Sequence, residues 1–176
     1  IRAESSGGNF NAVSIAGSEQ LSYFEPGGDF VGNGSAQVLA KARAGASRIE
    51  ASSTNAVRLV FELDATAQFE LSGILSMFAL GSAASGASVA LFELGESEAL
   101  FERTIAGAFT TAGELDAGTW VLEMEAHASL LAVGSGLSDA NAGGLFRDVR
   151  FALVPAPGAL CWACPAGALL MIRRRA

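Results

Sequence analysis

The alternation of apolar and polar residues over short runs is the feature that most constrains the fold of this chain. It is clearest in residues 57–64 and 119–128, where every second residue is apolar. Successive strand residues point to opposite faces of a sheet, so each run predicts a strand with one buried and one solvated face. The side chains that we expect to be buried are Val57, Leu59, Phe61, Leu63, Trp120, Leu122 and Met124. On the second run, those expected on the wet face are Thr119, Val121, Glu123, Glu125 and His127.

Further short runs, each bounded by turn-forming residues, indicate additional strands. They cover residues 10–15, 20–24, 68–77, 88–94, 98–105, 109–111 and 145–154. The two runs on either side of residues 95–97 predict a hairpin, because a short connection containing glycine joins them. In residues 145–154 the alternating positions are Leu145, Arg147, Val149, Phe151 and Leu153.

Glycine-rich segments predict the connections. Residues 25–35 and 134–144 are expected to be loops, and residues 81–86 a flexible turn. Gly73, inside the run 68–77, predicts a bulge or bend. Residues 36–44 stay ambiguous, since their composition favours a helix of about two turns among strands.

These runs amount to about eight to ten short strands without a long helical pattern. The fold class that this pattern predicts is all-β: an antiparallel β-sandwich, jelly-roll-like, followed by a short C-terminal apolar helix. Alternation alone does not separate a sandwich from a barrel. We expect residues 1–153 to form the β-domain and residues 154–176 to form a separate C-terminal segment.

The charge distribution argues against nucleic acid as a partner. Three of the eleven basic residues are Arg173, Arg174 and Arg175, so the rest of the chain has eight basic and eighteen acidic residues, a net charge of −10. Such a body repels phosphate backbones. Both cysteines, Cys161 and Cys164, lie in the C-terminal segment, so we expect no disulfide in the body.

The C-terminal segment has three parts. Two prolines in residues 154–158 end the sheet pattern, because proline lacks the N–H donor that a ladder needs. Residues 159–172 follow without a charge, and three arginines come next. Arginines resist crossing a bilayer, so they would stay on the cytoplasmic side with the body outside. Fourteen residues are fewer than the roughly 20 of a full span, which favours a transient anchor over a permanent one.

This order of a proline motif, an apolar stretch and a terminal arginine cluster resembles the PEP-CTERM sorting signal of exosortase substrates. The sequence differs from the family's namesake motif in having Ala156 where glutamate is usual. The resemblance implies export, retention in the membrane by the tail, and recognition and cleavage by exosortase near the prolines. It also implies association with the cell envelope or an extracellular polysaccharide matrix. The residues expected to carry sorting and processing are Val154, Pro155, Ala156, Pro157, Gly158, Arg173, Arg174 and Arg175. An ordinary single-pass anchor and a buried C-terminal helix are the alternatives.

Residues able to carry chemistry are few. His127 is the only histidine, which excludes a metal site built on several histidines, and the body has no Gly-x-Ser-x-Gly elbow. Glu123 and Glu125 share a strand face and resemble a glycosidase pair only loosely. We therefore assign no catalytic, cofactor-binding or metal-ligating residue. Calcium stays an alternative, because oxygen-bearing side chains bracket two glycine-rich loops: Ser138, Asp139, Asn141 and Asp148 in one, Asp29 and Asn33 in the other.

The leading hypothesis is an exported, non-enzymatic β-domain of the envelope or extracellular matrix, with exosortase and the membrane as partners of its tail. A carbohydrate-binding module, with extracellular polysaccharide as partner, is the first alternative. A secreted hydrolase is the second. Two exposed, coplanar aromatic side chains over a flat or concave face would favour sugar binding, and a cleft with close carboxylates around a pocket would favour hydrolysis. With neither, the structural hypothesis stands.

Overall fold

The computed structural model describes residues 2–6, 12–42, 48–133 and 139–154 of the 176-residue chain. Within these residues the chain forms strands and turns and no helix, so the predicted all-β class is confirmed. The described strands are β1 (Arg2–Ser6), β2 (Ala12–Phe24), β3 (Phe30–Ala42), β4 (Arg48–Leu63), β5 (Ala67–Leu80), β6 (Ala83–Glu93), β7 (Phe101–Arg103), β8 (Gly107–Leu115), β9 (Gly118–Val133) and β10 (Asp139–Val154). The helix expected in residues 159–172 lies outside the described residues.

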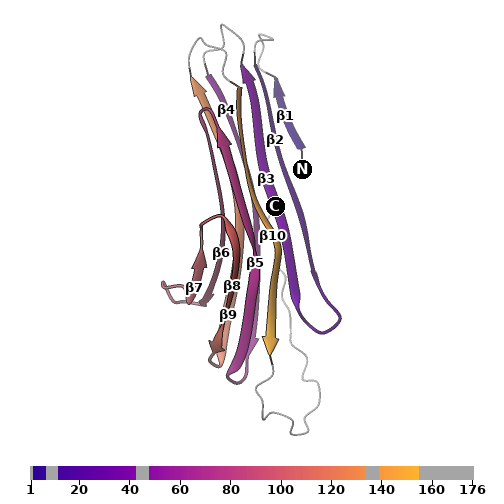
Figure 1. Cartoon of the computed structure of the whole chain (residues 1–176), viewed down its shortest axis with the longest axis vertical. Coiled ribbons are helices and arrows are strands. Elements are labelled where there is room, and N and C mark those ends of the chain that lie inside the picture. Colours follow the sequence, from indigo (N-terminus) through magenta and orange to yellow (C-terminus); the bar gives the residue numbers. More distant parts are fainter. Residues whose placement is uncertain (1, 7–11, 43–47, 134–138, 155–176) are drawn as a thin grey trace.

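The strands form two antiparallel sheets. Sheet A has the order β1-β2-β3-β10-β5-β8, and sheet B has the order β4-β9-β6-β7. Most strands run along the long axis of the molecule, and sheet B lies behind the strands of sheet A in the view of Figure 1. The predicted hairpin is confirmed, because β6 pairs antiparallel with β7 and Leu91 lies opposite Phe101. The pattern is sandwich-like, with the inner faces of both sheets supplying one core.

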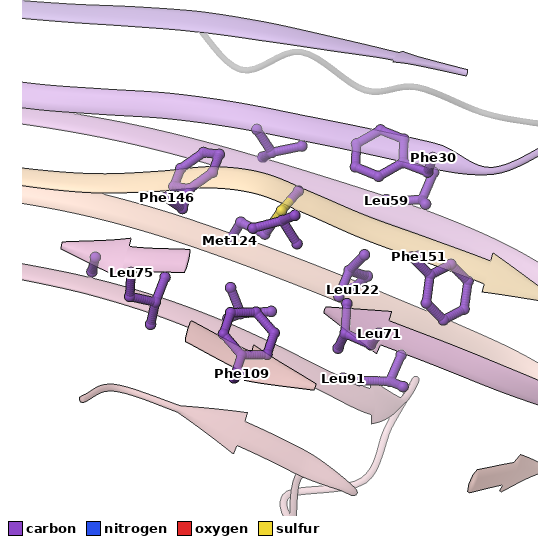
Figure 2. Close-up of a cluster of buried hydrophobic side chains, with 14 of the residues drawn as sticks. Phe30, Leu59, Leu71, Leu75, Leu91, Phe109, Leu122, Met124, Phe146 and Phe151 are labelled. Atoms are coloured by element: carbon purple, nitrogen blue, oxygen red, sulfur yellow. The ribbon is translucent and has the colours of Figure 1, made fainter. Parts of the chain in front are cut away.

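The core confirms most of the period-two prediction. Leu122 and Met124 of β9 have no exposed surface, and Val57, Leu59 and Trp120 are also buried. Phe61 and Leu63 are only partly buried and pack against the edge of this cluster. Figure 2 shows how side chains from both sheets meet there: Phe30, Leu71, Leu75, Phe109, Phe146 and Phe151 from sheet A with Leu59, Leu91, Leu122 and Met124 from sheet B.

A second cluster continues the core with smaller side chains. It contains Val38, Ala40, Ile49, Ala128, Leu130, Ala140 and Ala142. The two sheets approach each other closely beside it, at Gly144 of β10. A Cβ atom built on Gly144 would meet the carbonyl oxygens of Gly86 and His127, both on the facing sheet. Glycine is therefore required there because backbone faces backbone.

The loop predictions are wrong over much of their length. β3 already begins at Phe30, β10 begins at Asp139 and β6 begins at Ala83, so parts of all three glycine-rich segments are strand. The ambiguous residues 36–44 are strand as far as Ala42. The reason lies in packing. The space above Gly34 is filled by the ring of Phe146, and that above Gly32 by Met124, so these glycines make room for core side chains.

The bulge predicted at Gly73 lies in the strand opposite it. Gly73 stays in register with Phe109 of β8, whereas β10 has an extra residue between Arg147 and Arg150, where it passes Gly73. Asp148 adopts a φ of 50° there. The extra residue reverses the alternation on its N-terminal side, so Phe146 is fully buried while Arg147 is exposed. After the bulge Val149 and Phe151 are buried as predicted, whereas Leu153, near the end of the strand, is exposed.

Candidate functional site

The outer face of sheet B collects the polar residues that stood out in the sequence. Glu123, Glu125 and His127 follow one another at alternate positions of the central strand β9. Strand pairing places Arg58 of β4 beside Glu123, and Thr54 beside His127. These partners come from residues some 65 to 75 positions away in the sequence, so the row exists only because β4 and β9 pair.

A hollow of about 820 Å³ lies over this face. It forms because the strands beside β9 carry small side chains. The residues that supply its polar and charged groups are Thr54, Arg58, Ser88, Glu102, Glu123 and Glu125. Its small lining residues include Ala56 and Ala90. Three carboxylates stand against one guanidinium, so the hollow favours cationic or hydroxyl-bearing ligands over anions.

The charged groups of this face make two contacts. Arg58 Nε lies 3.3 Å from Glu123 Oε1, with both side chains about half exposed. His127 Nδ1 lies 3.8 Å from Glu125 Oε1, and the imidazole ring covers Gly86, where any Cβ would collide with it. The predicted solvated position of His127 is confirmed, since its side chain is 50% exposed. Exposed pairs of this kind hold side chains in place without adding much stability.

An apolar strip borders the polar row, and the sequence interpretation missed it. Val121 was expected on the wet face, yet it is fully buried. Val60 of β4 and Phe92 of β6 lie on either side of it in register. The sequence feature that could have indicated this strip is Val121 itself, an apolar residue in an otherwise polar row.

The residues considered for calcium do not come together. Asp148 and Asn33 are neighbours, because the Asp148 backbone N–H donates to Asn33 Oδ1 at 2.8 Å. Asp139 lies opposite Lys41, at the other end of β10, roughly 30 Å away at strand spacing. Ser138 lies outside the described residues. Among the residues that the structure describes, no three His, Cys, Asp or Glu side chains are close enough to hold a metal ion.

Of the eight sorting residues, only Val154 is described. It is the last residue of β10 and is 36% exposed. Pro155, Ala156, Pro157, Gly158 and the three arginines lie outside the described residues. The described part of the chain contains no helix long and apolar enough to cross a bilayer.

No known protein family matches the sequence, and no curated protein is recognisably related to it.

Proposed function

We propose that this chain is an exported protein of the cell envelope or extracellular matrix, sorted by its C-terminal segment and processed by exosortase. The observation that carries the proposal is the boundary at Val154. Strand β10 ends there, immediately before Pro155 and Pro157. Among the residues that the structure describes, the buried side chains lie between Ser14 and Phe151, and the last two residues of β10, Leu153 and Val154, are exposed. Cleavage at the prolines would leave every described strand and its buried side chains in place.

The strand pairing supports a jelly roll for the exported body. β3 pairs with β10, β4 with β9, β5 with β8 and β6 with β7. Such nested pairs form one long antiparallel ribbon. Successive pairs along this ribbon lie in alternate sheets, so the ribbon passes from one sheet to the other three times. A ribbon wrapped in this way is the design of a jelly roll. The role that we propose for this body is structural or interactive, without catalysis.

The processing step is tested by expressing the full chain in a host with exosortase and in one without it. We expect the mature protein to lose the arginines only in the first host. Replacing Pro155 and Pro157 together should leave uncleaved precursor in the membrane. Intact masses that retain Arg175 in both hosts would contradict processing. Recovery of the whole chain as a soluble cytoplasmic protein would contradict export as well.

Polysaccharide binding is the second candidate function, and the hollow on sheet B favours it. Its carboxylates and the Arg58 guanidinium can hydrogen-bond sugar hydroxyls, and Phe92 in the bordering apolar strip offers a surface for a sugar ring. The test is binding to polysaccharide isolated from the matrix of the native host. Glu123→Gln should weaken binding, while Glu70→Gln should not, because Glu70 lies exposed on the other sheet. Equal binding by both variants would refute a role of this face.

A further inference from the structure

The outer face of sheet A has a row of four paired residues that carries only two side chains. Strand pairing places Gln37 of β3 between Gly17 of β2 and Gly143 of β10, and Gly143 lies opposite Phe78 of β5. Gly17 is itself paired with Arg2 of β1. The backbone from Gly17 to Gly143 therefore has a strand on both sides, and this part of the row does not lie on an open edge.

The ring of Phe78 fills the space above Gly143. A Cβ atom built on Gly143 would collide with this ring, so the ring reaches over β10 on the side of Gln37. Phe78 is nevertheless 46% exposed. An exposed ring that rests on a glycine backbone has its position set before a ligand arrives, which lowers the cost of binding.

A hollow of about 600 Å³ lies next to this row, over β2 and β3. Its volume is within the range of sites for small ligands and single units of a polymer. Gly17 leaves space for it. The side chains that supply its polar groups are two amides, a hydroxyl and a carboxylate: Gln37, Asn141, Ser35 and Glu19. Leu39 adds apolar surface between them.

The polar groups indicate which kind of ligand fits. A side-chain amide both donates and accepts hydrogen bonds, as a sugar hydroxyl does. The amides of Gln37 and Asn141 form no hydrogen bond with the rest of the described chain, so both are available to a ligand. Among the described residues that line the hollow, there is one carboxylate and no lysine, arginine or histidine. A polyanion would find no opposite charge here, and the net charge of −10 on the body would repel it.

We propose that the hollow and the Phe78 ring together bind a neutral polysaccharide. The apolar face of one sugar ring rests on Phe78, and the amides of Gln37 and Asn141 bond to the hydroxyl groups of the adjoining sugar. Strands β3 and β5 are two strand spacings apart, about 10 Å, so a ligand that reaches both is longer than a single sugar ring.

This site is separate from the hollow on sheet B. The two hollows have no lining residue in common and lie over different sheets. They also differ in charge, since the hollow on sheet B has three carboxylates and one guanidinium. The inference depends neither on how the tail is processed nor on whether sheet B binds a ligand.

The test is affinity electrophoresis of the full chain in a polyoxyethylene detergent, which has no sugar headgroup to compete. Native gels contain hydroxyethylcellulose, galactomannan or dextran as the neutral polymer, or alginate as the polyanion. We expect at least one neutral polymer to retard the protein and alginate to leave its mobility unchanged. Phe78→Leu should weaken binding roughly tenfold, because it keeps an apolar side chain but removes the flat ring. Phe78→Tyr should bind like the parent protein, and Gln37→Ala should weaken binding about fivefold.

Gly143→Ala tests the position of the ring without changing a side chain that touches the ligand. Its methyl group would push the Phe78 ring off β10, so binding should fall as far as in Phe78→Leu while the fold stays intact. Phe24→Leu is the matched control. It makes the same substitution at a ring that is 38% exposed, opposite the core residue Phe30, and it should bind like the parent protein.

Four results would overturn the proposal. They are no retardation by any of the three neutral polymers, retardation by alginate as strong as by a neutral polymer, an equal loss of binding in Phe24→Leu, and full binding by both Phe78→Leu and Gly143→Ala. Glu123→Gln should leave this binding unchanged, and a loss in that variant would place the neutral polymer on sheet B instead. Circular dichroism of each variant checks that the fold is intact.

Discussion

Replacing Gly144 by alanine should destabilise the body strongly, because the two sheets touch there through backbone alone. The added Cβ would lie 2.8 Å from the His127 carbonyl oxygen and closer still to that of Gly86. Neither oxygen belongs to a side chain that can rotate away. Both are held in the ladder between β6 and β9, where Gly86 pairs with His127. The collision is relieved only if one sheet moves away from the other.

Gly143 provides a control one residue away on the opposite face. A Cβ there would meet the ring of Phe78, which is 46% exposed and can turn into solvent. Neither glycine adopts a positive φ, so alanine is free of backbone strain at both positions. Gly→Ala at a compatible site stabilises by about 0.4–1 kcal/mol through the unfolded state. Gly143→Ala should therefore stay within about 1 kcal/mol of the parent protein.

Overpacking a core costs about 1–3 kcal/mol when side chains can yield, and a backbone collision lies at or above the upper end. We expect Gly144→Ala to lower the free energy of unfolding by about 3 kcal/mol, against little change for Gly143→Ala. With a urea m-value of about 2 kcal/mol/M, the two midpoints should differ by more than about 1 M. Urea unfolding followed by circular dichroism measures this. Equal midpoints for the two variants would refute the close approach of the sheets at Gly144.

Three further predictions follow from the core and the charged face. Trp120→Ala should cost roughly 3–5 kcal/mol in urea unfolding, because the indole is 7% exposed and its Nε1–H donates to the Asp116 carbonyl at 3.0 Å; a cost under about 1 kcal/mol would place it on the surface. Asn55→Asp should cost more than about 2 kcal/mol at pH 7, since a carboxylate would face the Glu19 carbonyl that the amide now donates to. That loss should shrink as the pH falls toward about 4, where the protonated acid can donate; a pH-independent loss would contradict the contact. The body should not shift DNA in a gel at physiological salt, given its net charge of −10.

The strands with one uninterrupted face were predictable from local sequence. Val57 and Leu59 in β4, and Leu122 and Met124 in β9, are buried as their spacing indicates. These two strands pair with each other without a register shift over sixteen residues, so nothing disturbs their alternation. A period-two pattern reports which face of a regular strand a side chain occupies, whereas its burial also depends on the neighbours on that face, as the buried Val121 and the partly buried Phe61 show.

The glycine-rich strands were not predictable in the same way. A glycine is favoured both in a turn and where another group approaches the backbone closely, and local sequence does not distinguish the two. Gly32 and Gly34 belong to the second kind, since Met124 and Phe146 occupy the space above them. Both side chains come from residues about 90 to 110 positions away. The bulge in β10 has the same character, because Asp148 is supported by Asn33 of β3.

One part of the candidate site was predictable from local sequence, and the other part was not. The row of Glu123, Glu125 and His127 was visible in β9 alone, and the structure keeps it on the solvated face. The hollow beside it depends on which strands flank β9, and on the small side chains of Ala56 and Ala90 that those strands place there. Larger side chains at these two positions would fill the hollow while leaving every carboxylate in place. The proposed polysaccharide binding would therefore depend on residues that carry no chemistry themselves, and Ala90→Leu should weaken it as much as Glu123→Gln.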